Sequence, residues 1–240
     1  NIIVVLLGML DSRKQTILQL IIEDFIQTAE PVGSKHLADD FGMNVSSATI
    51  RNDMAFLEHE GYLRQTHTSS GRVPTELAYL YYLQNVVQPK CQENELENLR
   101  TGMELSNDVE SALKGISKQL VDLTGETVIL ALDPRWSYYT GVSNLFQKPE
   151  FQENNLFYLI SRFVDQFDDV LAQMFDAVQE EQMVYIGSQN PFGDQMSTIM
   201  IRYQLHDDRH GLLGLVGPLR MNYSKNIALM EQAKELIRKL

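Results

Sequence analysis

Cysteine is almost absent from this sequence, which has one, Cys91, in 240 residues. A lone cysteine excludes a disulfide within the chain and is typical of a protein from a reducing cytoplasm. It also cannot build a zinc site by itself, and the five histidines show no ligand spacing such as HExxH. We therefore predict neither a metal ion nor any other cofactor.

Long hydrophobic runs are missing as well. The apolar run that opens the chain, NIIVVLLGML at 1–10, is too short for a membrane helix, which needs about 20 residues. It also lacks the basic start and the cleavage site of a signal peptide. We interpret it as an N-terminal extension in which residues 1–8 precede a natural start at Met9, and we expect a cytoplasmic protein without a membrane partner.

Positive charge is scarce, because 20 Lys and Arg stand against 32 Asp and Glu, for a net charge of −12. Residues 1–86 hold six of the cations against ten acidic residues, and the remainder holds 14 against 22. This balance counts against nucleic-acid binding by bulk electrostatics. Any contact with DNA must depend on the local placement of a few cations.

Catalytic motifs are missing too. There is no GxSxG elbow, and the acidic residues at 165–169 and 180–181 are typical of solvated helix surface. The segment GLLGLVGPLRMNYSK at 211–225 lacks the order of a phosphate loop and favours a buried strand with closely packed glycines. We predict no enzyme. A small effector pocket stays an alternative, with three candidate residues: Arg220, Tyr223 and Lys225.

The N-terminal part does contain a series of helix signals. Asp11 is a good N-cap for a helix that the pair Glu30-Pro31 ends. Ser34 caps a short helix, and Ser46 or Ser47 caps a third one, SATIRNDMAFLEHE. A short helix, a tight turn and a second helix in succession predict a helix-turn-helix.

A small β-hairpin is predicted directly after it. Residues 62–66 can form a strand, Thr-Ser-Ser-Gly at 68–71 is a turn cluster, and residues 72–74 return. Thr75 then caps another helix. A hairpin in this place is a wing, so we expect a winged helix-turn-helix.

Residues at the start of the second helix of such a motif meet base edges in the major groove. Arg51 can pair with guanine and Asn52 with adenine, and neighbouring hydroxyls can bond phosphates or bases. An arginine in the wing can enter the minor groove. The candidate DNA contacts are Lys35, Ser46, Ser47, Thr49, Arg51, Asn52, His67, Ser70 and Arg72. The plainer alternative is a capped surface helix, an ordinary hairpin and a solvated lysine.

The second half of the chain mixes helices and strands. A linker at 88–90 leads to an amphipathic helix over 93–123, with a kink or a break into two helices near 102–106. Helices at 155–175 and 223–240 then flank five strand candidates, which predicts an α+β domain. The strand candidates are 127–132, 138–143, 183–187, 197–205 and 212–216.

Four regions follow from these signals. They are an apolar extension (1–10), a winged helix-turn-helix DNA-binding domain (11–87), a helical linker and dimerisation region (88–125) and an α+β regulatory domain (126–240).

Several segments resemble the HrcA family of heat-inducible transcription repressors. PVGSK at 31–35, SSATIRN at 46–52 and HTSSGRVPT at 67–75 resemble its N-terminal domain. SNLFQKPEF at 143–151 and GLLGLVGPLRMNYSK at 211–225 are similar to its C-terminal motifs. The resemblance covers most of the chain after Met9, with both sets of motifs in the same order as in the family.

The resemblance implies a repressor that binds an inverted-repeat operator of chaperone operons as a homodimer, with a GAF-like C-terminal domain and the chaperonin GroEL as a partner. It implies DNA contacts at the recognition-helix residues and at Arg72. The inserted segment that helps dimerisation in the family is absent before Gly141, so we expect the 93–123 helix, together with the N-terminal domain, to take over dimerisation. The alternative function is a ligand-sensing regulator with a small-molecule effector in the GAF-like domain.

Overall fold

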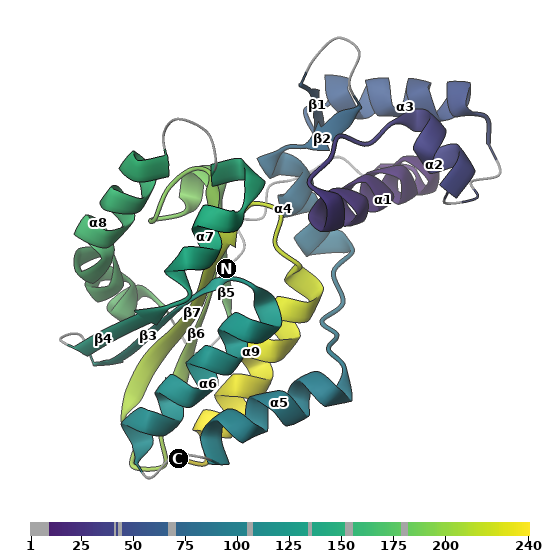
Figure 1. The fold of residues 1–240 in the computed structure, drawn as a ribbon. Helices are drawn as coiled ribbons and strands as arrows, with labels where there is room; N and C mark the ends of the chain where they lie inside the picture. Colours follow the sequence, from purple (N-terminus) through teal and green to yellow (C-terminus); the bar gives the residue numbers. More distant parts are fainter. Residues whose placement is uncertain are drawn as a thin grey trace. The chain divides into compact units, whose positions relative to one another are not determined.

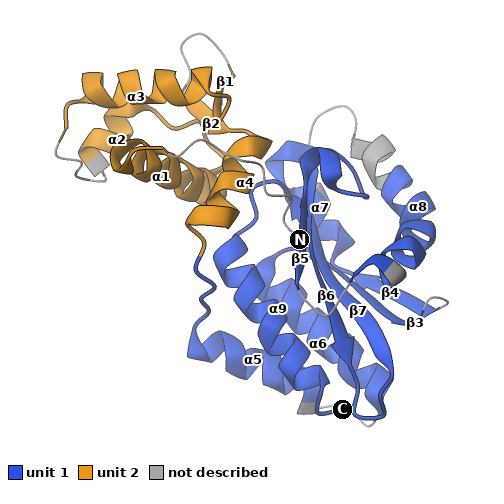
Figure 2. Ribbon diagram, turned by 180° about the vertical axis from the view of Figure 1, so that it is seen from behind, with its two compact units in different colours: residues 1–2, 88–240 blue, residues 3–87 orange. Residues whose placement is uncertain are grey.

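The computed structural model describes residues 10–40, 42, 45–66, 71–104, 108–133, 136–151, 156–178 and 182–240. The chain forms two compact units, one that ends at Val87 and one that begins at Gln88 (Figure 1, Figure 2). The apolar run at the N-terminus lies outside the described residues up to position 9, so its interpretation stays a prediction.

The first unit follows the predicted order of helices and hairpin. Its elements are α1 (Ser12–Thr28), α2 (Ser34–Asp40), α3 (Ser47–His59), β1 (Leu63–Gln65), β2 (Arg72–Pro74) and α4 (Glu76–Asn85). The N-cap side chains explain three of the helix starts, because Asp11, Ser46 and Thr75 each accept a backbone N–H three residues on. Ser46, and not Ser47, is thus the cap of α3, and α2 begins at Ser34 instead of after it.

Apolar side chains from all four helices and both strands fill one core in this unit. Ile17 and Ile21 of α1 are fully buried, and so are Leu37 of α2 and Ile50 and Leu57 of α3. The aromatic rings of α4 are also buried in this core. They are Tyr79, Tyr81 and Tyr82, and Tyr81 stacks edge-on against Tyr62 at 5.5 Å between ring centres.

The second unit is built on a five-stranded antiparallel sheet. Its strands are β3 (Thr127–Asp133), β4 (Trp136–Thr140), β5 (Met183–Ile186), β6 (Met196–Gln204) and β7 (His210–Pro218), in the order β4-β3-β7-β6-β5. Its helices are α5 (Glu93–Glu104), α6 (Val109–Thr124), α7 (Val142–Gln147), α8 (Leu156–Ala177) and α9 (Tyr223–Ile237), with short 3-10 turns at Pro149–Phe151 and Gly187–Gln189. Helices on an antiparallel sheet confirm the predicted α+β class.

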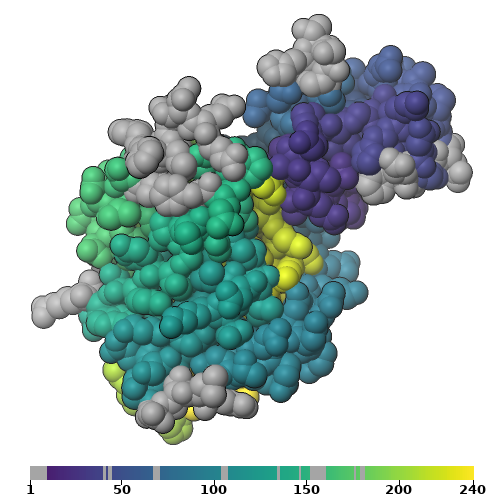
Figure 3. All heavy atoms as spheres, in the orientation of Figure 1, coloured from purple at the N-terminus to yellow at the C-terminus, as the bar shows by residue number. Residues whose placement is uncertain are grey.

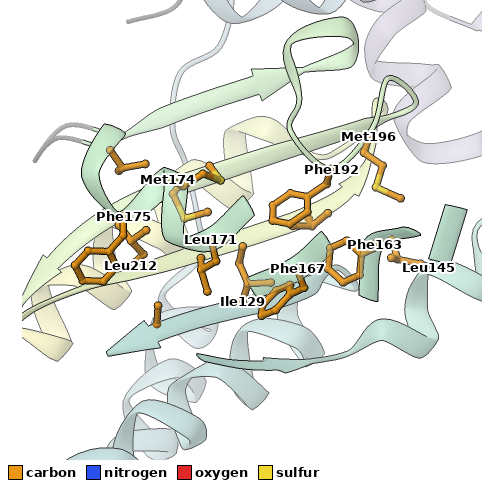
Figure 4. Close-up of a cluster of buried hydrophobic side chains, with 14 of the residues drawn as sticks. Ile129, Leu145, Phe163, Phe167, Leu171, Met174, Phe175, Phe192, Met196 and Leu212 are labelled. Atoms are coloured by element: carbon orange, nitrogen blue, oxygen red, sulfur yellow. The ribbon is translucent and has the colours of Figure 1, made fainter. Parts of the chain in front are cut away.

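The sheet is covered on both faces. α7 and α8 cover one face, where Phe163 and Phe167 of α8 pack over Ile129 of β3 (Figure 4). α6 and α9 cover the other, and α5 packs outside them. Atoms of α5 and α6 hide most of α9, yellow in Figure 3, from that side.

Within the described ranges, no helix combines the length and the apolar composition that a membrane crossing requires.

Two predictions for this unit are corrected. The strand expected at 138–143 ends at Thr140, because Gly141 takes a left-handed conformation with φ +79° and starts α7, which the sequence did not predict. The expected helix over 93–123 is two helices, α5 and α6, which pack against each other. The break near residue 105 that we predicted as one alternative is therefore the observed one.

The apolar seams of α5 and α6 are used inside the unit. Leu99, Leu113, Ile116 and Leu120 are fully buried. The exposed side chains of the two helices are polar or charged among the described residues: Glu93, Asn94, Glu97, Asn98, Arg100, Thr101, Glu110, Ser111, Lys118 and Asp122. Part of each seam is thus used within the chain, whereas Leu96, Met103, Val109 and Leu123 are half-buried, and a dimer interface at 93–123 stays a prediction.

Two glycines bring α5 and α6 into close contact. A Cβ added at Gly102 would lie 2.7 Å from the carbonyl oxygen of Gly115, and a Cβ at Gly115 would overlap the carbonyl oxygen of Gly102. Only hydrogen fits between backbones this close. The crossing of the two helices therefore depends on both glycines.

We expect Gly115→Ala to lower the free energy of unfolding by about 1–3 kcal/mol, because two backbones would have to move apart. Urea denaturation followed by circular dichroism measures the change. The control is Gly33→Ala, where an added Cβ has no neighbour within 4 Å. Equal stability of the Gly115→Ala protein and the wild type would show that the crossing is looser than described.

Candidate nucleic-acid interface

The α3 helix buries one face and exposes the other. Its inner side chains, Ile50, Asp53, Met54 and Leu57, lie in the core of the first unit. On the outer face, Arg51 and Asn52 are exposed and flanked one turn away by the small side chains Ala48 and Ala55. This pattern places the two predicted base-reading side chains on the solvent face of the helix, where small neighbours let another surface approach closely.

The N-terminus of α3 carries the three predicted hydroxyl groups. The Ser46 Oγ accepts the Thr49 backbone N–H at 3.2 Å, and the two hydroxyl oxygens lie 3.0 Å apart. Ser46 is exposed, whereas Ser47 and Thr49 are half-buried. These groups stabilise the first turn of α3. The N-terminus of a helix favours the binding of a phosphate. Lys35 is exposed on α2, one helix earlier.

Backbone pairing fixes the base of the wing. The Val32 N–H donates to the Arg72 carbonyl at 2.9 Å, and the Arg72 N–H donates to the Val32 carbonyl at 2.9 Å. Gly71 lies against the same segment, because an added Cβ would meet the carbonyl carbon of Val32 at 2.5 Å. The wing is therefore joined to the turn before α2. Two predicted wing contacts, His67 and Ser70, lie outside the described residues.

The Arg72 side chain has a partner inside the unit. Its Nε and Nη2 both lie 2.9 Å from Oε2 of Glu58 on α3, and its side chain is 16% exposed. This ion pair joins the wing to the recognition helix. The sequence predicted Arg72 as a DNA contact. In the described structure its charge is instead neutralised by Glu58, so a contact with DNA requires the pair to open.

Three of the six cations before residue 88 are paired in this way. Arg13 binds Asp53 through two hydrogen bonds of 2.6 and 3.2 Å, and Lys14 pairs with Asp11. The other three cations are exposed, with no carboxylate partner among the described residues: Lys35, Arg51 and Arg64. The sequence prediction missed Arg64. The alternation of buried and exposed side chains along β1 indicates that Arg64 is exposed, since its neighbour Leu63 is buried in the core.

The predicted effector residues each contact a different element of the second unit. The Tyr223 hydroxyl is buried, 2.7 Å from Ser197 Oγ, and Arg220 pairs with Glu150. Lys225 binds Glu95 of α5 at 2.6 Å. All three polar groups are engaged in contacts within the chain, and a shared effector pocket stays a prediction. Within the described residues, no three His, Cys, Asp or Glu side chains group closely enough to hold a metal ion.

A buried acid lies close to this region. Glu126 is 3% exposed, its Oε1 accepts a hydrogen bond from Lys148 Nζ at 3.2 Å, and its buried Oε2 has no hydrogen-bond partner among the described residues. The loss of hydration raises the pKa of Glu126 to about 7, although Lys148 and Arg220 favour the ionised form. Glu126 is therefore protonated in the folded chain over a pH range in which it ionises when unfolded.

This difference predicts a pH dependence of stability. Between pH 4.5 and about 7 the folded chain holds a proton on Glu126 that the unfolded chain releases, so the free energy of unfolding falls as pH rises. Glu126→Gln removes this contribution, which amounts to about 1–3 kcal/mol at the upper end. Urea denaturation of both proteins across this range measures it. Parallel pH curves for wild type and Glu126→Gln would contradict the assignment.

Family models match nearly the whole of the described chain. A model described as the HrcA protein C-terminal domain matches residues 58–227, and a DeoR-like helix-turn-helix domain matches residues 13–72. The second match covers α1 from its second residue, α2, α3 and β1, and ends at the first residue of β2. Arg51, Asn52 and Arg64 lie within it.

Curated relatives with the name heat-inducible transcription repressor HrcA are similar in sequence. The protein of Acetivibrio thermocellus is 32% identical over 194 residues, which cover 80% of this chain and 54% of that protein. The protein of Caldanaerobacter subterraneus is 41% identical over 120 residues, 50% of this chain and 35% of the relative. In these matches the chain spans about a third to a half of the length of its relatives.

A solved structure shares the fold. A crystal structure of a hypothetical protein superimposes with a TM-score of 0.80 at 19% identity, covering 96% of this chain and 98% of that one. At this identity the similarity concerns the fold alone.

Proposed function

The chain belongs to the HrcA family of heat-inducible transcription repressors, and from this premise we propose that it represses chaperone operons by occupying an inverted-repeat operator as a homodimer in the cytoplasm. Two winged helices would lie in successive major grooves of the palindrome, about one helical turn apart or a multiple of it. Bound there, the protein blocks transcription sterically.

The observation that carries the proposal is the outer face of α3. Arg51 and Asn52 are exposed on a helix whose opposite face is fully buried, and its N-terminus is held by the Ser46 cap. Arginine and asparagine are the side chains that read guanine and adenine edges in the major groove. The exposed Lys35 and Arg64 supply the charge for phosphate contacts, which set the position of the protein on the duplex.

The proposal extends to the signal. As the family resemblance implies, the chaperonin GroEL keeps the repressor active, and its occupation by unfolded proteins under stress releases the operator. Each DNA-binding unit has three exposed cations without a carboxylate partner among the described residues, so operator binding should be modest and strongly dependent on salt. A partner could then shift the binding equilibrium.

A fluorescence anisotropy titration tests the proposal. The inverted repeat upstream of the chaperonin operon and a scrambled duplex of equal length are compared at one salt concentration, with and without purified chaperonin. Preference for the repeat supports a repressor, and a stronger preference with chaperonin supports the feedback. Equal affinity for both duplexes under both conditions would refute the proposed function.

Replacing Arg51 distinguishes a contact with a base from a contact with a phosphate. We expect Arg51→Ala to cost about 1–3 kcal/mol of operator binding and little of the affinity for the scrambled duplex, because a bidentate contact with a base is lost. The matched control is Arg64→Ala, which should weaken both duplexes about equally and reduce the salt dependence by about one phosphate contact. A uniform loss for Arg51→Ala would assign Arg51 to the phosphates instead.

Replacing Glu58 tests whether its carboxylate restrains the wing arginine. Glu58→Gln removes a negative charge and frees Arg72, so we expect tighter binding of both duplexes and a salt dependence steeper by about one contact. Glu60→Gln is the control, because this exposed carboxylate lies beside His59 and its loss releases no arginine. If both variants steepen the salt dependence equally, Arg72 takes no part in the DNA contact.

A further inference from the structure

The strand β4 lies at one edge of the five-stranded sheet of the second unit (Figure 1). Its inner side pairs with β3 in antiparallel register, with Leu130 opposite Tyr138 near the centre. In such a strand every second residue directs its N–H and C=O groups away from the partner strand. Apart from the pairing with β3, residues 137–140 have no backbone hydrogen-bond partner in the part of the chain that the structure describes. The outer edge of β4 can therefore accept a further strand.

β4 lacks the features that usually protect such an edge. Its sequence, WSYYT, contains no charged residue and no proline, which are common means of preventing two sheet edges from pairing. Ser137 and Tyr139 are exposed. At the opposite edge of the sheet no side chain of β5 is exposed, since three are half-buried and Ile186 is buried. β4 is thus the more accessible of the two edges.

Exposed apolar side chains lie beside this edge. Tyr139 is 41% exposed, and its ring lies edge-on to that of Phe167 on α8, with 4.9 Å between the ring centres. The next residue of α8, Asp168, accepts a hydrogen bond from Ser137 Oγ at 2.8 Å, so this turn of α8 lies against β4. Val164, one turn earlier on the same side of the helix, is 44% exposed. Among the described residues of the second unit, Tyr139 and Val164 are the exposed large hydrophobic side chains.

The charges next to β4 are balanced. Lys114 of α6 lies over the rings of Trp136 and Tyr138 on one face of the sheet, 5.5 and 5.4 Å from the ring centres. Asp168 lies on the other face, at Ser137. Because each chain has a net charge of −12, two copies repel each other unless they meet at a surface with little net charge. The edge of β4 meets this condition.

From these observations we propose that β4 is the dimer contact, where the β4 strands of two copies pair antiparallel about a two-fold axis and join the two sheets into one. The inference rests on the proposed function, which requires a homodimer. An antiparallel pair of identical strands is self-complementary, because each copy offers the other the same backbone groups in reverse order. The two Tyr139 side chains then lie on the same face of the joined sheet, where they bury apolar surface.

Light scattering after gel filtration of the full chain tests the contact. We expect the mass of two chains for the wild type. Tyr139→Lys places like charges at the contact, so we expect the dimer dissociation constant to rise at least about tenfold. Tyr139→Phe keeps the ring beside Phe167 and should stay dimeric. The charge control is Gln173→Lys, an exposed position nine residues after Val164 and therefore on the opposite side of α8.

Cross-linking tests the pairing of the strands directly. In a chain with Cys91→Ser, one cysteine is placed at 137, 138 or 139, and the three proteins are oxidised mildly, alone and mixed in pairs. Residues opposite each other in an antiparallel pair have Cα atoms about 4.5–5.5 Å apart, which a disulfide can bridge. We expect a disulfide-linked dimer for at least one protein or mixture, and none for Gln173→Cys.

The outcomes separate this inference from the proposed function. A wild type that is monomeric at the concentrations at which it binds the operator contradicts the homodimer, and with it this inference. A dimeric wild type that Tyr139→Lys leaves intact, without a cross-link at 137–139, overturns the β4 contact alone and favours the helices α5 and α6. An equal loss of the dimer in Gln173→Lys also overturns it. If Tyr139→Lys does not fold, the cross-links decide.

Discussion

Two backbone hydrogen bonds between Val32 and Arg72 hold the DNA-binding unit in its observed form. They join segments 40 residues apart, the turn before α2 and the return strand of the hairpin. The contact requires a glycine at 71, because the two backbones leave no space for a Cβ. Once it forms, Arg72 lies beside Glu58, so the hairpin is attached to α3 through a side chain and to the turn before α2 through its backbone. The motifs around residues 31–35 and 67–75 are thus two sides of one contact.

The local signals in the sequence were sufficient to predict most of the helices and strands of this unit. Asp11, Ser46 and Thr75 satisfy backbone donors a few residues away, so the helix starts could be predicted from neighbours in the sequence. The role of Arg72 could not, because its partner Glu58 lies 14 residues away and meets it only after the hairpin has docked. The same holds for the contact between Gly102 and Gly115, because the sequence allowed either a kinked helix or two helices there and did not indicate which residues would meet.

In the second unit, prediction was accurate where burial sets a clear pattern. The strands with apolar runs, β3, β6 and β7, were found close to their observed bounds, whereas the short α7 was missed because it depends on the left-handed Gly141. The candidate effector residues have partners that the sequence alone could not indicate. Arg220, Tyr223 and Lys225 are close in sequence, but each has a partner on a different element, Glu150, Ser197 and Glu95. Polar side chains at a turn into a helix are as suited to tying elements together as to binding a ligand.

The scarcity of cations limits what one DNA-binding unit can bind. Carboxylates neutralise three of the six cations before residue 88, so a single DNA-binding unit has little charge with which to hold a duplex. Tight binding of an operator then depends on two such units on one duplex, because the second unit binds at a high effective concentration once the first has bound. A chain with abundant cations would depend less on a second copy, because each unit would bind on its own.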